Sequence, residues 1–157
     1  MKRVTLKYKF KSETADLNCP PYKGNIPRPV IPVRLGYGTK FTPFFDALLD
    51  TGADISMFWT EIAEFLGIDW HSCRSVSFNG AGGQPAPGYI HKVKVDVGGY
   101  IYGTEVAFVP KDKLARPALL GQHGFFEGVE CSFDRRNGGI RIAFDYNEKE
   151  GTIALPD

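Results

Sequence analysis

The stretch Phe45-Asp46-Ala47-Leu48-Leu49-Asp50-Thr51-Gly52-Ala53-Asp54-Ile55-Ser56 contains the pattern that decides the fold. In it, an apolar run ends in a carboxylate, which is followed by a hydroxyl, a glycine and a small residue. This order predicts a buried strand that delivers Asp50 to a turn, because glycine closes such a turn without steric cost. A carboxylate beside apolar walls is a candidate general acid or base, since desolvation and nearby charge shift its pKa. Asp-Thr-Gly also suits an ordinary turn, so the triplet alone leaves both interpretations open.

The composition around this stretch indicates one domain built from short strands. The chain has 157 residues, a size at which one domain buries a core without needing disulfides. Its 18 glycines and 11 prolines interrupt the chain often, and its 12 phenylalanines and 7 tyrosines favour strands over long helices. A net charge of +1 and the lack of a lysine or arginine run argue against nucleic acid as a partner.

Cysteine, histidine and apolar residues give no sign of a metal, a cofactor or a membrane. Cys19, Cys73 and Cys131 are odd in number and too widely spaced for a disulfide framework. The histidines are far apart, and no Cys/His pair has the spacing of zinc ligands. No apolar run approaches the about 18 residues that span a bilayer, and residues 1–10 alternate rather than forming a signal peptide. These features predict a cytoplasmic protein without a metal or cofactor.

Hydrophobic periodicity predicts an all-β domain. Two of the expected strands meet at Gly98-Gly99 and form a hairpin. Alternating or continuous apolar runs predict strands at residues 4–10, 30–35, 41–49, 56–59, 75–78, 89–97, 100–109, 118–121, 129–133, 139–144 and 151–155.

One or two short helices and two irregular segments are expected between these strands. A helix is predicted at residues 60–67, with Thr60 as its N-cap and Gly67 just beyond its C-terminus. One or two helical turns are expected at 122–128. An irregular arm is expected at about residues 11–29, and residues 79–88 are too rich in glycine for a rigid element.

Three features follow one another in a fixed order along the chain. They are Asp-Thr-Gly-Ala at 50–53, the glycine-rich turn at 80–88, and Leu119-Leu120-Gly121. Their order and separation resemble the retropepsins, the retroviral type of aspartic protease, over roughly residues 30–133. The resemblance implies a closed, barrel-like acid-protease fold with one Asp-Thr-Gly lobe per chain, in a single domain spanning 1–157. It also implies that the glycine-rich turn lies at or beside a flap that closes over substrate, and that Leu-Leu-Gly packs under the catalytic loop.

The resemblance also assigns roles to individual residues. Asp50, Thr51 and Gly52 are expected to be catalytic, with the Thr51 hydroxyl bonding across a twofold axis and Gly52 allowing close approach of the backbone. An extended peptide or protein substrate is expected to add as a strand between this loop and the flap. The implied substrate-binding residues are Ala53, Asp54, Gly82, Gly83 and Leu120.

The number of suitable acids per chain predicts a homodimer. The implied chemistry needs two carboxylates so close that they share one proton, because two like charges at that distance cannot both ionise cheaply. This chain supplies one Asp-Thr-Gly, whereas its other acids, including Asp46, Asp54, Asp69 and Asp145, lack the Thr-Gly sequel. A twofold axis through the site places Asp50 of each copy against the other. Neither nucleic acid nor a membrane is expected as a partner.

Gln122 departs from the family pattern, in which an arginine usually follows Leu-Leu-Gly and pairs with the acid corresponding to Asp54. Gln122 cannot form that charge pair, although its amide can still donate a hydrogen bond. Pro85 and Pro87 also restrict the backbone of a segment expected to move as a lid. Two alternatives to a protease therefore stay open: a catalytically weak module that binds peptides in the same fold, and a module whose purpose is dimerisation.

Overall fold

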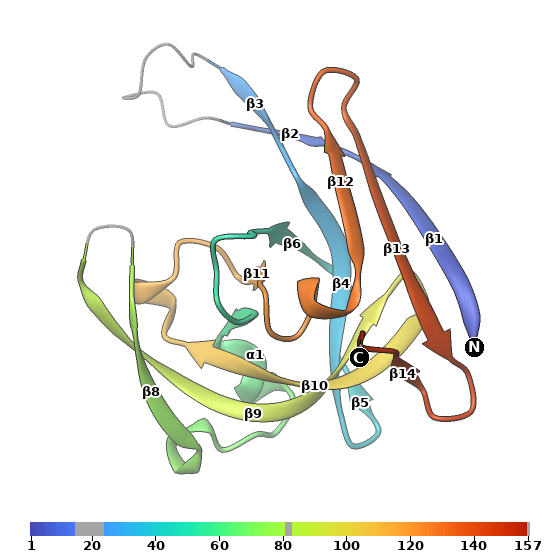
Figure 1. Ribbon diagram of the computed structural model, residues 1–157. Helices are drawn as coiled ribbons and strands as arrows, with labels where there is room; N and C mark the ends of the chain where they lie inside the picture. The colour runs from blue at the N-terminus through green and yellow to red at the C-terminus, as the bar shows by residue number, and fades with distance from the viewer. Residues whose placement is uncertain (15–23, 81–82, 157) are drawn as a thin grey trace.

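The computed structural model describes residues 1–14, 24–80 and 83–156 (Figure 1). Within these ranges the chain is mostly β-structure with one short α-helix, α1 (Thr60–Phe65), which confirms the predicted fold class. Short 3-10 turns occur at η1 (Trp70–Ser72), η2 (Lys111–Lys113) and η3 (Phe126–Gly128). The strands are β1 (Lys2–Lys9), β2 (Lys11–Thr14), β3 (Asn25–Arg28), β4 (Val30–Tyr37), β5 (Lys40–Phe41), β6 (Phe45–Leu49), β7 (Met57–Trp59), β8 (Arg74–Asn79), β9 (Pro85–Val97), β10 (Tyr100–Val109), β11 (Ala118–Leu120), β12 (Glu130–Asp134), β13 (Gly139–Asn147) and β14 (Thr152–Ile153).

A closed barrel forms from β4, β6, β11, β7, β10 and β9, because each strand pairs with the next and β9 pairs back with β4. At this closure Val33 lies opposite Val97 and Leu35 opposite Val95, and all four side chains are at most 1% exposed. Burial of such apolar side chains is the main favourable contribution to folding. These apolar positions stabilise the closed barrel, which the resemblance to retropepsins had implied.

Two parallel strands bring the Asp-Thr-Gly and Leu-Leu-Gly features together. In the register of β6 and β11, Leu48 lies opposite Leu119 and Leu49 opposite Leu120. Because parallel strands end at the same edge of a sheet, the loops that follow them lie side by side. The predicted packing of Leu-Leu-Gly against the Asp-Thr-Gly loop is confirmed at this edge.

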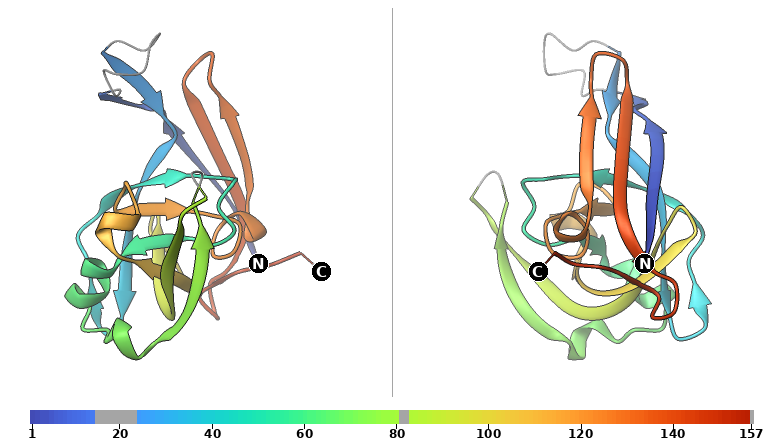
Figure 2. Two further views of the ribbon diagram at one scale, coloured as in Figure 1. Left: turned by 90° about the vertical axis from the view of Figure 1, so that its left-hand side faces the viewer. Right: turned by 45° about the vertical axis from the view of Figure 1, so that its right-hand side comes forward.

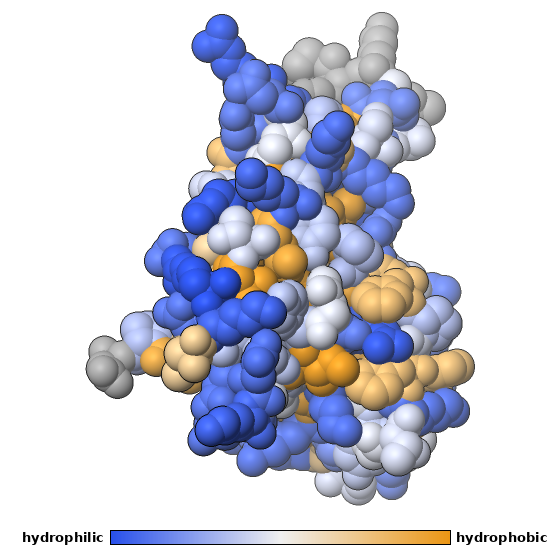
Figure 3. All heavy atoms as spheres, turned by 90° about the vertical axis from the view of Figure 1, so that its right-hand side faces the viewer, coloured by the Kyte–Doolittle hydropathy of each residue, from blue (hydrophilic) through white to orange (hydrophobic). Residues whose placement is uncertain are grey.

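A second sheet, in the order β1-β13-β12 with β14 beside β13, flanks the barrel. Val4 and Phe144 from this sheet belong to the same apolar core as the barrel strands. Lys7 and Lys9 lie on the exposed side of β1, as the predicted alternation requires. Figure 3 views this side of the molecule, where hydrophilic side chains predominate around separate apolar patches. No helix within the described ranges is long and apolar enough to span a membrane.

Several local predictions were wrong in their limits. The expected strand at 41–49 is interrupted, because Pro43 offers no N–H to a ladder and the Thr42 hydroxyl instead accepts a hydrogen bond from Leu35 N at 3.0 Å. The arm at 11–29 is not wholly irregular, since β2 and β3 pair as antiparallel strands; residues 15–23 lie outside the described ranges. Figure 2 shows the β2–β3 and β12–β13 hairpins projecting from the same end of the barrel.

The ends of the short helical segments also differ from the prediction. Trp59 is the N-cap of α1 and no side chain caps it, while Thr60 is buried as the first helical residue. Gly67 adopts a φ of 78° just after the helix, as predicted for a glycine at that position. The region 122–128 contains one 3-10 turn, and β9 begins at Pro85, inside the segment expected to be irregular.

The arm is tied to the loop between β10 and β11 by a salt bridge. Arg116 donates two hydrogen bonds to the Glu13 carboxylate, at 2.8 and 2.7 Å. These bonds hold the pKa of Glu13 below its ordinary value of 4.5. Lys11 also pairs with Asp46 on β6, so the arm contacts both β6 and the loop between β10 and β11.

Glu13→Gln is expected to lower the free energy of unfolding by roughly 1 kcal/mol at neutral pH, because the partly exposed ion pair is lost. A carboxyl whose folded-state pKa is lowered stabilises the fold above its unfolded-state pKa, and this contribution is lost as the pH falls through the lowered value. The difference between wild type and variant should therefore be smaller at pH 3 than at pH 7. Urea unfolding at pH 7 and pH 3 measures this difference in the free energy of unfolding. Glu148→Gln, which breaks an exposed pair with Lys2, is the matched control and should change little. An equal difference at both pH values would contradict the assignment.

Candidate active site

The Asp50 carboxylate is held at the start of a tight turn after β6. Its Oδ1 accepts a hydrogen bond from Gly52 N at 3.0 Å, and its backbone carbonyl accepts one from Ala53 N at 3.1 Å. Its own N–H donates to the Leu120 carbonyl at 3.0 Å. The turn predicted from the sequence is therefore present: Gly52 holds the Asp50 side chain, and β11 holds the Asp50 backbone.

The segment 121–124, called here the 121–124 loop, supports the turn from below. Gln122 N donates to the Ala53 carbonyl at 2.8 Å, and His123 N donates to the Asp54 carbonyl at 2.9 Å. Gly121 lies against the same backbone, because a Cβ added there would lie 2.7 Å from the carbonyl oxygens of Ala53 and Ile55. Only a residue without a side chain fits this contact.

Gln122 takes a different partner from the family arginine. Its Nε2 donates to the Thr51 carbonyl at 2.8 Å and so bonds the backbone of the turn itself. The predicted loss of a charge pair with Asp54 and the predicted amide hydrogen bond are both consistent with this contact. The turn is thus held by a neutral hydrogen bond instead of an ion pair.

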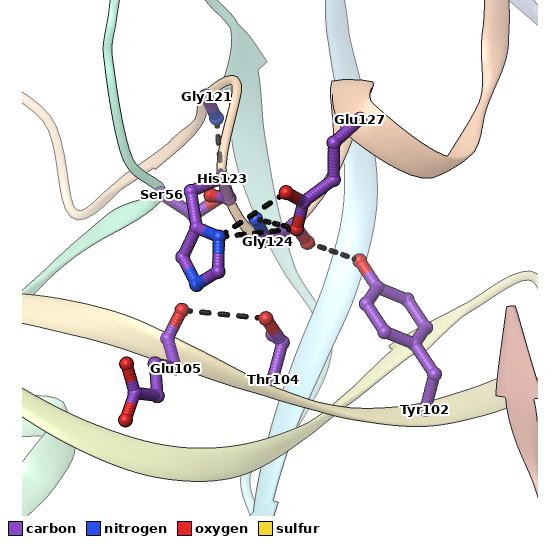
Figure 4. Close-up of polar contacts among 8 residues, drawn as sticks. All are labelled: Ser56, Tyr102, Thr104, Glu105, Gly121, His123, Gly124 and Glu127. Carbon is purple, nitrogen blue, oxygen red and sulfur yellow. Dashed lines mark hydrogen bonds and ion pairs between the residues drawn. The ribbon is translucent and has the colours of Figure 1, made fainter. Parts of the chain in front are cut away.

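A buried serine links the two loops from the inside. Ser56 is fully buried; its Oγ donates to the His123 carbonyl at 3.2 Å and accepts from Gly121 N at 3.1 Å (Figure 4). The other end of the 121–124 loop is held by Glu127, whose carboxylate accepts from Gly124 N at 3.0 Å and lies 3.2 Å from His123 Nδ1. These contacts fix the backbone of the 121–124 loop, which is itself hydrogen-bonded to the segment that follows Asp50.

Tyr102 adds a further anchor to the 121–124 loop. Its hydroxyl donates to the Gly124 carbonyl at 2.8 Å (Figure 4). Burial raises the pKa of the Tyr102 phenol far above its ordinary value, so it remains a hydrogen-bond donor at any physiological pH. The loop behind the candidate catalytic turn therefore has fixed partners at Ser56, Glu127 and Tyr102.

Asp50 lines a cleft with a volume of about 670 Å³. Its lining residues come from the Asp-Thr-Gly turn, the β8–β9 hairpin, the loop between β10 and β11, and the ends of neighbouring strands. Between β8 and β9, Gly83 N donates to the Gly80 carbonyl at 2.9 Å, and Gly83 has a φ of 74°. The cleft is lined by Asp50, Gly52, Ala53, Asp54, Met57, Ser77, Phe78, Asn79, Gly80, Ala86, Val109, Lys113, Leu114 and Leu119.

The structure brings four of the eight residues expected at the site to the lining of this cleft. The expectation that Leu120 binds substrate was wrong, because its side chain is fully buried in the core. Its neighbour Leu119 lines the cleft instead, since successive strand residues point to opposite faces. Thr51 lies on the exposed crest of the turn, and Gly83 lies at the exposed tip of the hairpin. Gly82 lies outside the described residues. Of the residues expected at the site, Asp50, Gly52, Ala53 and Asp54 line the cleft.

Sequence reasoning missed several residues that shape the site. Phe78 and Lys113 line the cleft from segments that are distant in sequence, and Ser56 supports it from inside. A serine inside an otherwise apolar run was the one available signal for Ser56. Within the described ranges, no group of three or more His, Cys, Asp or Glu side chains is placed to hold a metal. The carboxylates that line the cleft are those of Asp50 and Asp54.

Known proteins provide an independent comparison. A family model described as aspartyl protease matches residues 31–123, which is more than half of the chain. The fold is similar to that of a retropepsin-like aspartic protease from Rickettsia conorii, with 14% identity, a TM-score of 0.57, and coverage of 90% of this chain and 93% of that chain. The EIAV protease complexed with the inhibitor HBY-793 is 22% identical with a TM-score of 0.46, over 60% of this chain and 82% of that chain. No curated protein matches the sequence significantly.

Proposed function

Because this chain belongs to the aspartyl protease family, we propose that it is an endopeptidase in which the Asp50 carboxylates of two identical copies together hydrolyse a peptide bond. The observation that carries the proposal is the placement of Asp50. It sits on a hydrogen-bonded turn, beside a cleft that a β-hairpin borders. The family model includes this turn, the hairpin and the Leu-Leu-Gly segment.

The paired carboxylates would divide the work of an acid and a base. One shared proton leaves one carboxylate ionised, and this carboxylate takes a proton from the attacking water. The protonated partner donates to the scissile carbonyl, so no covalent intermediate is needed. Gly52 N–H holds one oxygen of Asp50 and so orients the carboxylate toward the cleft.

The second carboxylate would come from a second copy of the chain. Each chain carries one Asp-Thr-Gly, and a twofold axis beside the turn supplies the missing acid. Thr51 is exposed on the crest of the turn, which leaves its hydroxyl available to the equivalent turn of the partner. The hydrogen bond from Gln122 to the Thr51 carbonyl supports this crest.

The substrate would be an extended peptide lying between the turn and the β8–β9 hairpin. Its backbone would add as a strand, while its side chains alternate between the walls of the cleft. The walls are largely apolar, with Met57, Phe78 and Leu119 among them. A peptide with apolar side chains near the scissile bond fits this lining.

The proposal predicts that cleavage depends steeply on protein concentration. Where single chains dominate, the rate of cleavage of an unfolded protein should rise more steeply than linearly, because assembly precedes chemistry. Rates measured over a concentration series, beside the molecular mass in solution, test this. A statine-type peptide should inhibit cleavage and increase the dimer fraction. A linear dependence by a monomer would contradict the shared site.

A peptide-binding module is the second candidate. It is favoured by Pro85 and Pro87, which lie at the start of β9 and restrict the movement of the β8–β9 hairpin. A dimer that binds the statine-type peptide but cleaves no unfolded protein would support this candidate over the protease.

A further inference from the structure

The cleft beside Asp50 contains one basic side chain among its described lining residues, Lys113. Asp50 and Asp54 are the other charged residues of the lining, and the rest is apolar or neutral. Within the described part of the chain, Lys113 forms no ion pair, unlike Arg116 on the same loop. An unpaired cation in a substrate cleft is a candidate determinant of specificity.

The loop that carries Lys113 is anchored on both sides. Within η2, Lys113 N donates to the Pro110 carbonyl at 2.9 Å. The Trp59 indole N–H donates to the Leu114 carbonyl at 2.8 Å, and Arg116 is held by Glu13. These bonds fix the backbone on either side of Lys113, whose exposed side chain lines the cleft.

The charges of the cleft give Lys113 a clear electrostatic role. A pair of Asp50 carboxylates that shares one proton keeps one negative charge, and Asp54 adds another. These charges repel an acidic side chain of the substrate. The ammonium of Lys113 offsets this repulsion at its own wall, and it repels a basic side chain there.

We propose that Lys113 makes the cleft selective for peptides with an acidic side chain directed at the loop between β10 and β11, beside apolar side chains directed at the opposite wall. This inference rests on the proposed function. Side chains of an extended peptide alternate, so one face can present the acid to Lys113 while the other packs against residues such as Phe78 and Leu119. Because a twofold axis repeats the loop, the preference applies on both sides of the scissile bond.

The test compares peptides that differ in one charge. A cleavage site is first located in an unfolded protein, and peptides spanning it are made with Glu, Gln or Lys at each position in turn. Wild type should favour Glu over Lys by roughly tenfold or more in kcat/KM at one position or more on each side of the cut. The preference should weaken as the salt concentration rises.

Two charge reversals on the same turn provide the matched comparison. Lys113→Glu should invert the preference toward Lys peptides. Lys111→Glu should leave the preference intact, because the Lys111 ammonium lies 4.8 Å from the centre of the Trp59 ring and does not line the cleft. Binding of the same peptides to an Asp50→Asn protein, measured by fluorescence anisotropy, gives a readout that does not require turnover.

The outcomes separate this inference from the proposed function. Cleavage by wild type with no charge preference, or a preference that Lys113→Glu leaves unchanged, would overturn the role of Lys113 and leave the protease intact. Equal loss of the preference in both reversal variants would show a general effect of loop charge and would also overturn it. Failure of wild type to cleave or bind any peptide would overturn the proposed function and this inference together.

Discussion

Asp50→Asn is expected to abolish peptide hydrolysis, lowering kcat by roughly 100-fold to 10,000-fold, the range that a positioned acid–base group supplies. Asparagine can neither take a proton from water nor donate one as an acid. The fold should be unaffected, because the asparagine Oδ1 can still accept the hydrogen bond from Gly52 N. Steady-state cleavage of a peptide measures the loss, and thermal unfolding with molecular mass in solution verifies the fold and the assembly.

A second variant serves as the control for the Asp50→Asn prediction. Asp112→Asn changes an exposed acid on η2 that does not line the cleft, and it should retain wild-type kcat. Full activity of the Asp50→Asn protein would remove the proposed mechanism altogether.

Mixtures of the two chains test whether the site is shared. At constant total protein, random assembly of equal amounts of wild type and Asp50→Asn leaves about a quarter of the dimers with two Asp50 carboxylates. Activity should therefore fall to about a quarter of the wild-type value, not to a half. A fall to one half would mean that each chain works alone, and the homodimer proposal would be wrong.

Gly121→Ala is expected to damage both stability and catalysis. The added Cβ would lie 2.7 Å from the carbonyl carbon and oxygen of Ile55 and from the carbonyl oxygen of Ala53. These are backbone atoms of the segment after Asp50, so the turn must move. Overpacking of this kind costs about 1–3 kcal/mol, and a displacement of about 1 Å at a reacting group costs roughly 100-fold in rate. Urea unfolding and kcat measure the two effects.

Gly103→Ala is the matched control for this prediction. Gly103 lies in β10, and an added Cβ would have no atom within 4 Å. Neither glycine has a positive φ, so the comparison isolates the steric contact from backbone strain. The control should stay within about 0.5 kcal/mol of wild type and keep its activity. A Gly121→Ala protein as stable and active as the control would show that the close contact does not hold the turn.

Much of the site was predictable because its signal lies in consecutive residues. An apolar strand that ends in Asp50, a turn that needs Gly52, and a hairpin at Gly98-Gly99 are each encoded locally, and the structure contains all three. The order of the three motifs indicated the aspartic protease family, and the match to the aspartyl protease family model confirms it. Local chemistry was a poorer guide to the start of the helix, where packing buries Thr60 and leaves Trp59 as the N-cap.

The face of a strand was not predictable where its residues are all apolar. Ala118, Leu119 and Leu120 carry no alternation, so nothing in their order shows which leucine faces the cleft. The pairing of β11 with β6 and β7 decides it, and a shift of one residue would exchange the two. The resemblance implied Leu120 as a substrate-binding residue, whereas the structure places Leu119 in the cleft.

The sequence by itself determined that this chain carries one acid on a glycine turn at the end of a buried strand, because those properties depend on residue type and near neighbours. Only the tertiary structure decided what surrounds that acid. Lys113, Phe78 and Ser56 reach the site from segments far apart along the chain, and closing the barrel brings them together. Side-chain contacts across such distances depend on strand pairing and register, which no local pattern encodes.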